Sequence, residues 1–170
     1  RIFEIHIRDI NETPTEISIS NESLIENVPL GSILGILTTS DEDTADIHTY
    51  SLVAGSGDNN NNMFLILDNQ IITNSEINYE NLNELYIRLR SSDDKGLYLE
   101  KSFTINVSDV NEKPVDLTIS NDSILNIAES GTLVGIFYTT DEDTYDTNFS
   151  YSFFSTDTVN SADSIYFTFS

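Results

Sequence analysis

The chain repeats itself at a fixed spacing of 100 residues. The acidic segment 9–14 (DINETP) matches 109–114 (DVNEKP), and the acidic segment 39–44 (TSDEDT) matches 139–144 (TTDEDT). Two glycines of the first copy, Gly31 and Gly35, recur in the second copy at the same spacing. An offset that is kept over several separate blocks is the signature of a tandem array of one structural unit.

The repeat divides the chain into three parts. Residues 1–13 are expected to be the last strand and linker of a preceding repeat, 14–113 a complete repeat, and 114–170 the truncated N-terminal part of a second repeat. Because the chain opens directly on an alternating, strand-like segment, we also expect it to be an excerpt of a longer protein.

Alternation of apolar and polar residues predicts β-strands throughout. The pattern is clear over 3–7, 85–89 and 103–107, where every second residue is apolar, as in strands with one buried and one wet face. Segments rich in Gly, Pro, Asn and Asp separate these runs. About seven short strands in roughly 100 residues is typical of a Greek-key, immunoglobulin-like β-sandwich. The sequence therefore predicts an all-β fold built of tandem sandwiches.

Charge and composition exclude several functions. Seven Lys and Arg stand against 29 Asp and Glu, which gives a net charge of -22. Nucleic acid and anionic lipid are thereby disfavoured as partners, because both require a basic surface. The chain has no cysteine and no apolar run of the roughly 20 residues that direct membrane insertion requires. It also lacks the common nucleophile, phosphate-loop and zinc-protease motifs, so we expect no enzyme here.

The acidic residues gather at the expected linkers and in the loops that would lie beside them. Several carboxylates placed together repel one another unless a cation lies among them. Calcium is favoured because it takes six to eight oxygen ligands from carboxylates, amides and carbonyls. Magnesium requires stricter geometry, and zinc prefers His and Cys. The two histidines, His6 and His48, are expected to be solvated rather than ligands.

Five motifs together resemble those of the cadherin repeat. The linkers 9–14 and 109–114 resemble the cadherin interdomain motif, and 25–27 followed by Gly31 resembles its first glutamate motif. Segments 77–80 (INYE), 41–43 and 141–143 (DED), and 91–96 (SSDDKG) resemble, in order, its Leu-Asp-x-Glu, Asp-x-Asp and last-aspartate motifs. The Asn-Glu form of the linker is most similar to cadherin-like repeats of bacterial surface proteins.

The resemblance implies calcium ligands at two joints. At the first joint they are Asn11, the carbonyl of Thr13, Asp41, Asp43 and Asp93. At the second joint two ions would be held by Glu26, Asn78, Glu80, the carbonyl of Val110, Glu112 and Asp143. A third ion would be held by Asn111, the carbonyl of Lys113, Asp141 and Asp143, with Asp109 in support. Asn78 and Glu112 replace aspartates of the family pattern.

The resemblance further implies a function for these joints. Calcium would rigidify the array for cell adhesion at an extracellular or cell-surface location, in a parent protein that could be membrane-anchored. Its partners would be neighbouring repeats of the same chain, and another cell-surface protein or a polysaccharide. The alternative is a carbohydrate-binding or spacer module of a secreted polysaccharide-degrading enzyme.

Overall fold

A computed structural model describes residues 3–143 and 148–152. It divides the chain into two compact units, Arg1–Val110 and Asn111–Ser170, and each is described by itself. The part of the second repeat expected over 144–147 and 153–170 lies outside the described residues. Within the described part, no helix is long and apolar enough to cross a membrane.

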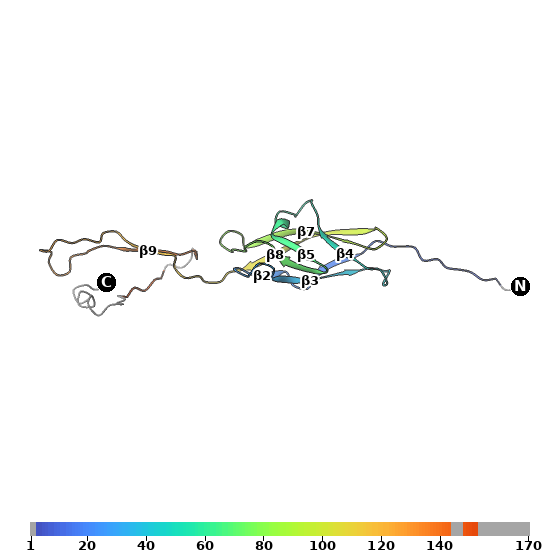
Figure 1. Cartoon of the computed structure of the whole chain (residues 1–170), viewed down its shortest axis with the longest axis horizontal. Helices are drawn as coiled ribbons and strands as arrows, with labels where there is room; N and C mark the ends of the chain where they lie inside the picture. The colour runs from blue at the N-terminus through green and yellow to red at the C-terminus, as the bar shows by residue number, and fades with distance from the viewer. Residues whose placement is uncertain (1–2, 144–147, 153–170) are drawn as a thin grey trace. The chain divides into compact units, whose positions relative to one another are not determined.

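Two four-stranded sheets form the first unit. The first has the order β1-β3-β6-β5, with every neighbouring pair antiparallel. Its strands are β1 (Glu16–Ile19), β3 (Ile33–Ser40), β5 (Phe64–Leu67) and β6 (Gln70–Thr73). Figure 1 shows β3 and β7 on opposite sides of this unit.

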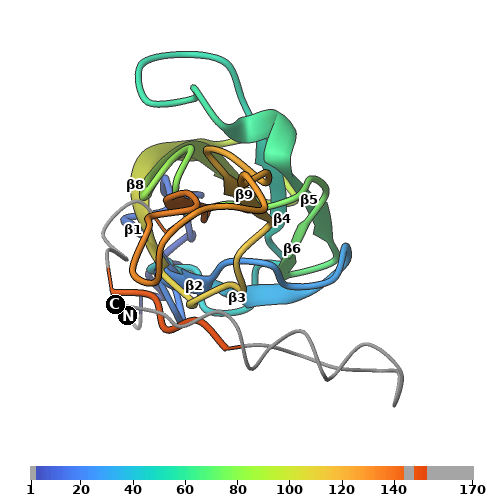
Figure 2. The same ribbon diagram turned by 90° about the vertical axis from the view of Figure 1, so that its left-hand side faces the viewer.

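The second sheet has the order β2-β8-β7-β4. Its strands are β2 (Ser23–Ile25), β4 (Thr49–Leu52), β7 (Glu84–Ser92) and β8 (Tyr98–Ser108). β2 runs parallel to β8, whereas β7 pairs antiparallel with both β8 and β4. A short 3-10 helix, η1 (Asn61–Met63), precedes β5, and the loop between β4 and η1 stands away from the strands (Figure 2). The predicted all-β, immunoglobulin-like sandwich is confirmed.

The core lies between the two sheets and follows the predicted alternation. Every second residue of β7, namely Leu85, Ile87 and Leu89, is buried. Inward residues of β1, β2, β3, β5, β6 and β8, together with Ile77 between β6 and β7, complete one apolar cluster: Ile17, Ile19, Leu24, Leu34, Leu37, Phe64, Ile71, Phe103, Ile105 and Val107. Burial of this cluster supplies the main stabilisation of the sandwich.

The strand predicted over 3–7 does not form. The structure has no strand between residues 3 and 15, and the alternating apolar side chains Phe3, Ile5 and Ile7 are exposed. A strand needs a hydrogen-bonded neighbour and an apolar face to pack against. No strand among the described residues pairs with this segment. Its alternating apolar side chains therefore have no apolar surface to pack against.

The second unit repeats the start of the first. β9 (Asp116–Ile119) pairs antiparallel with β10 (Phe137–Thr140), and Leu117 lies opposite Thr139 as Ile17 lies opposite Thr39. A Cβ on Gly35 would stand 2.8 Å from the Ile19 side chain, and one on Gly135 would stand 2.7 Å from the Ile119 side chain. The repeated glycine therefore allows the first strand of each unit to pack closely.

Removing a core side chain should destabilise the first unit far more than removing a surface one. Ile87 is fully buried in β7, whereas Leu65 in β5 is 50% exposed. We expect Ile87→Ala to lower the free energy of unfolding by about 2–5 kcal/mol and Leu65→Ala by about 1 kcal/mol or less. Urea unfolding followed by circular dichroism measures both. Equal losses would contradict the assigned core.

An ion-pair network on β7 and β8 gives the fold an acid-sensitive component. The Glu100 carboxylate accepts hydrogen bonds from Arg88 (2.8 Å) and Arg90 (2.9 Å). These contacts, that of Arg88 first, lower the pKa of Glu100 below its ordinary value of 4.5. A lowered folded-state pKa adds stability above the unfolded-state value, and this stability is lost as the pH falls through the folded value.

We therefore expect Glu100→Gln to reduce the dependence of stability on pH. Between pH 6 and pH 3, the urea midpoint of the unaltered chain should fall more than that of the variant. Both proteins are measured in chelator, with Glu22→Gln as the matched control because Glu22 is exposed between β1 and β2. Parallel curves for the unaltered chain and Glu100→Gln would refute a folded-state role for this network.

Candidate metal centre

Two strand ends from different sheets meet at one end of the first unit. Thr39, near the end of β3, and Ser91, near the end of β7, place their hydroxyl oxygens 2.6 Å apart. Thr39 also donates to the hydroxyl oxygen of Tyr50 at 3.0 Å. Two residues beyond this contact, the chain reaches Asp41 on one side and Asp93 on the other. Carboxylates that are 52 positions apart in sequence are thereby brought to one place.

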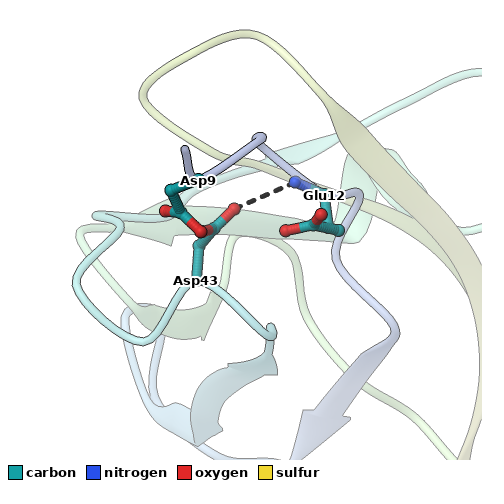
Figure 3. A group of neighbouring side chains, drawn as sticks. All are labelled: Asp9, Glu12 and Asp43. Atoms are coloured by element: carbon teal, nitrogen blue, oxygen red, sulfur yellow. Dashed lines mark hydrogen bonds between the residues drawn. The ribbon is translucent and has the colours of Figure 1, made fainter. Parts of the chain in front are cut away.

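The first linker carries more carboxylates to this end. Oxygens of Asp9, Glu12 and Asp43 lie within 4.8 Å of one another, and Figure 3 shows the three side chains turned toward a common point. The backbone N–H of Glu12 donates to Oδ2 of Asp43 at 2.9 Å. Desolvation, followed by repulsion from Asp43 and Asp9, raises the pKa of Glu12. This group of three is called the outer cluster below.

A second group lies deeper. Oxygens of Asp41, Asp46 and Asp93 also lie within 4.8 Å of one another, and these residues form the inner cluster. The Asp41 side chain is only 2% exposed and that of Asp46 only 6%. The backbone N–H of Asp43 donates to Oδ1 of Asp41 at 3.1 Å, so one short loop supplies acids to both clusters.

The Asp93 carboxylate organises the loop that follows β7. Its Oδ1 accepts hydrogen bonds from the backbone N–H groups of Lys95, Gly96 and Leu97. Its Oδ2 accepts from Nδ2 of Asn11 at 2.8 Å. Burial acts to raise the pKa of Asp93, but the hydrogen bonds from Asn11 and the backbone outweigh it and lower that pKa. Asp93 is therefore held as a carboxylate in contact with the linker.

Two oxygens at this end are buried and have no hydrogen-bond partner in the part of the chain that the structure describes. They are Oδ1 of Asn11 and Oδ2 of Asp46. A buried acceptor that lacks a partner is costly, and proteins normally satisfy it with a hydrogen-bond donor, water or a cation. Together with the surrounding carboxylates, these oxygens make a donor set made entirely of oxygen. Such a set suits a hard divalent cation.

The structure places the predicted ligands of the first joint as follows. Asn11 contacts Asp93, Asp41 lies with Asp93 in the inner cluster, and Asp43 lies in the outer cluster. Thr13 is exposed, and the role of its carbonyl stays a prediction. Asp9 and Glu12, which were expected at this joint without an assigned ion, lie beside Asp43.

Three residues near the inner cluster were not predicted. Asp46 belongs to the cluster itself, Lys95 pairs with it at 2.7 Å, and His48 places Nε2 3.0 Å from Oδ2 of Asp41. The prediction that His48 is solvated is wrong, because its side chain is 12% exposed. Its hydrogen bond is the main cause of the lowered pKa of Asp41. The one sequence signal for Asp46 is that Asp146 stands 100 residues later.

The first unit also holds several predicted ligands of the second joint. Glu26 is almost fully buried, and its two carboxylate oxygens accept from the backbone N–H groups of Tyr79 (2.8 Å) and Val110 (2.7 Å). A carboxylate oxygen of Glu80 lies within 4.8 Å of one on Glu26, and within the same distance of one on Asp109. Asn78 uses its Oδ1 to accept from the backbone N–H of Asn81 at 2.8 Å.

The other predicted ligands of the second joint belong to the second unit. The backbone N–H of Glu112 donates to Oδ2 of Asp143 at 2.8 Å, and that of Asp143 donates to Oδ1 of Asp141 at 3.2 Å. These are the contacts that Glu12, Asp43 and Asp41 make in the first unit. Asn111 donates from its side chain to the carbonyl of Glu112, and Lys113 is exposed.

Comparison with known proteins identifies the fold. No family model matches the chain. It is 28% identical over 146 residues to "Protocadherin Fat 4" of Homo sapiens, a match that covers 80% of this chain and 3% of that protein.

Solved cadherin structures resemble the chain as well. The human protocadherin-24 EC1-2 structure (form II) has a TM-score of 0.60 at 20% identity, covering 78% of this chain and 63% of that one. The protocadherin gamma B4 extracellular domain has a TM-score of 0.55 at 25% identity, covering 80% and 22%. The chain thus spans less than two thirds of each of these proteins. Its fold is that of cadherin extracellular domains.

Proposed function

We propose that this chain is a calcium-binding segment of an extracellular, adhesion-type array of cadherin-like repeats. The observation that carries the proposal is the pair of acidic clusters where the first linker meets the ends of β3 and β7, with two buried oxygens that lack a partner. Six different carboxylates from three separate segments converge there: Asp9, Glu12, Asp41, Asp43, Asp46 and Asp93.

The donor chemistry favours calcium over other metals. Carboxylate and amide oxygens are available in excess, and calcium accepts six to eight of them in flexible geometry. The one histidine at this end, His48, already contacts Asp41, and the chain has no cysteine, so the usual zinc ligands are scarce. Asn11, Asp41, Asp43 and Asp93 would hold the ion, with the Thr13 carbonyl as a further ligand.

The linker contacts explain how binding would stiffen a joint. The amide of Glu12 is held by Asp43 and the side chain of Asn11 by Asp93, so the linker is already docked on the loops of the repeat that follows it. Repulsion among the carboxylates opposes this docking. Bound calcium would supply the positive charge that removes the repulsion. The linker residues would then be held in one conformation rather than several.

The same proposal extends to the second linker. Glu112, Asp143 and Asp141 repeat the local contacts of the first linker, and Glu26 is held by two backbone amides. We therefore retain the full predicted set as calcium ligands: Glu26, Asn78, Glu80, Asp109, Val110, Asn111, Glu112, Lys113, Asp141 and Asp143.

Adhesion and an extracellular location rest on the cadherin-like fold and on the named similarities to protocadherins. In such an array the immediate partners are neighbouring repeats of the same chain, and the distal partner is another cell-surface molecule. The proposal assigns the acidic residues to cation binding rather than to catalysis. The finer resemblance to bacterial surface repeats stays a prediction.

Calcium should raise the stability of the chain. For extracellular modules with dissociation constants of about 10⁻⁴ to 10⁻³ M, 10 mM calcium should add about 1.4 to 2.7 kcal/mol per site to the free energy of unfolding. Thermal unfolding in 10 mM calcium, in 10 mM magnesium and in chelator measures this effect. Equal midpoints in calcium and chelator would refute the proposal.

The variant Asp43→Asn tests whether calcium binds at the acidic clusters of the first linker. Asp43 is in the outer cluster, so the variant should lose much of the calcium-induced shift in the unfolding midpoint. Asp68→Asn is the matched control: it removes the same charge at a position with φ of 55°, which Asn tolerates. An undiminished shift in Asp43→Asn would place the calcium elsewhere.

Adhesion has a separate test. Beads coated with the chain should aggregate in millimolar calcium and disperse in chelator if contacts between copies provide adhesion. Binding of the beads to immobilised polysaccharide without bead aggregation would instead favour a carbohydrate-binding module.

A further inference from the structure

Asp46 differs from the other acids of the inner cluster in how its charge is balanced. Asp41 is paired with His48, and Asp93 accepts hydrogen bonds from three backbone N–H groups and Asn11. These partners are built into the surrounding loops. Among the residues that the structure describes, the Asp46 carboxylate has one charged partner, the ammonium group of Lys95, which lies 2.7 Å from Oδ1, and its buried Oδ2 has no hydrogen-bond partner.

The partner of Asp46 lies at the surface. The Lys95 side chain is 47% exposed, whereas that of Asp46 is 6% exposed. A lysine side chain has four rotatable bonds and is well hydrated, so it can leave the carboxylate for solvent without unfolding the loop. An ordinary lysine is charged at neutral pH, so its ammonium group can neutralise the Asp46 carboxylate that it contacts.

We propose that Asp46 is an additional ligand of the inner-cluster calcium site and that Lys95 is a tethered cation that competes with calcium for it. The proposal rests on the calcium-binding function proposed above. In the absence of calcium, Lys95 neutralises Asp46 and limits repulsion with Asp41 and Asp93. When calcium binds, Oδ2 of Asp46 coordinates the ion, and the positive charge of Lys95 becomes unfavourable beside it. Lys95 thus lowers the affinity of the site and sets the calcium concentration at which it fills.

The repeat in the sequence supports Asp46 independently of its contacts. Asp146 follows Asp143 by three residues, as Asp46 follows Asp43. Its structure lies outside the described residues, but its presence shows that this acid belongs to the repeated loop.

Calcium titration calorimetry on the full 170-residue chain tests the proposal with opposite expectations for two variants. Lys95→Gln removes the competing charge and should tighten calcium binding by about threefold to tenfold. Asp46→Asn removes a charged ligand and should weaken binding by about tenfold. In the double variant, the gain in affinity from Lys95→Gln should be smaller than in the single variant, because the competition for Asp46 is gone and only repulsion between Lys95 and the ion remains.

Two controls separate this mechanism from bulk charge and from misfolding. Lys101→Gln removes the same charge at a site where lysine pairs with Glu16 on β1, and it should leave the calcium affinity unchanged. Circular dichroism in chelator checks the fold of each variant. A gain of affinity in Lys95→Gln cannot arise from a misfolded chain.

The outcomes distinguish the two levels of the proposal. If the unaltered chain takes up no calcium, the proposed function fails and this inference fails with it. If the unaltered chain binds calcium but Asp46→Asn binds equally well, Asp46 is not a ligand. If Lys95→Gln binds no more tightly than the unaltered chain, or if Lys101→Gln tightens binding as much, Lys95 is not a competing cation.

Discussion

The hydrogen bond from a linker amide to an aspartate of the following repeat is the contact on which the candidate site depends. It joins Glu12 to Asp43 in the first unit and Glu112 to Asp143 in the second. An amide that donates to a carboxylate makes a charge-assisted bond, which is stronger than one between neutral groups. This bond fixes the linker where its own acids face those of the loop. The contact that docks the linker therefore also brings the carboxylates close together.

The sandwich architecture brings together the strand ends that carry these carboxylates. β3 and β7 belong to different sheets, yet Thr39 and Ser91 join them by a hydrogen bond just before each strand ends. Ser91 is fully buried, so the junction excludes water on the inner side of the carboxylates. Charges at the edge of such an apolar, hydrogen-bonded base interact more strongly than they would in bulk water. A rigid fold thus makes the local repulsion large enough for a cation to have a large effect.

Much of the fold could be predicted from the sequence because the repeat shows each motif twice, 100 residues apart. Alternation over 85–89 and 103–107 identified the core strands, and the recurring acids predicted where the linkers lie. The same alternation over 3–7 was misleading, since alternation reports what a segment can pair with and not whether a partner is present. His48 was also misjudged: its contact with Asp41 depends on how a loop folds back, which has no periodic signal. The one sequence signal that pointed to Asp46 was the recurrence of an aspartate at position 146.

The two clusters differ in their need for an added cation. The inner cluster has His48 beside Asp41 and Lys95 beside Asp46, so part of its charge is balanced by the chain itself. Among the residues that the structure describes, no ion pair reaches Asp9, Glu12 or Asp43 of the outer cluster, and the pKa of Glu12 is raised there. Repulsion is therefore relieved internally near the sandwich and remains unrelieved at the linker. An added cation therefore has most to contribute where the linker meets the loops of the first unit.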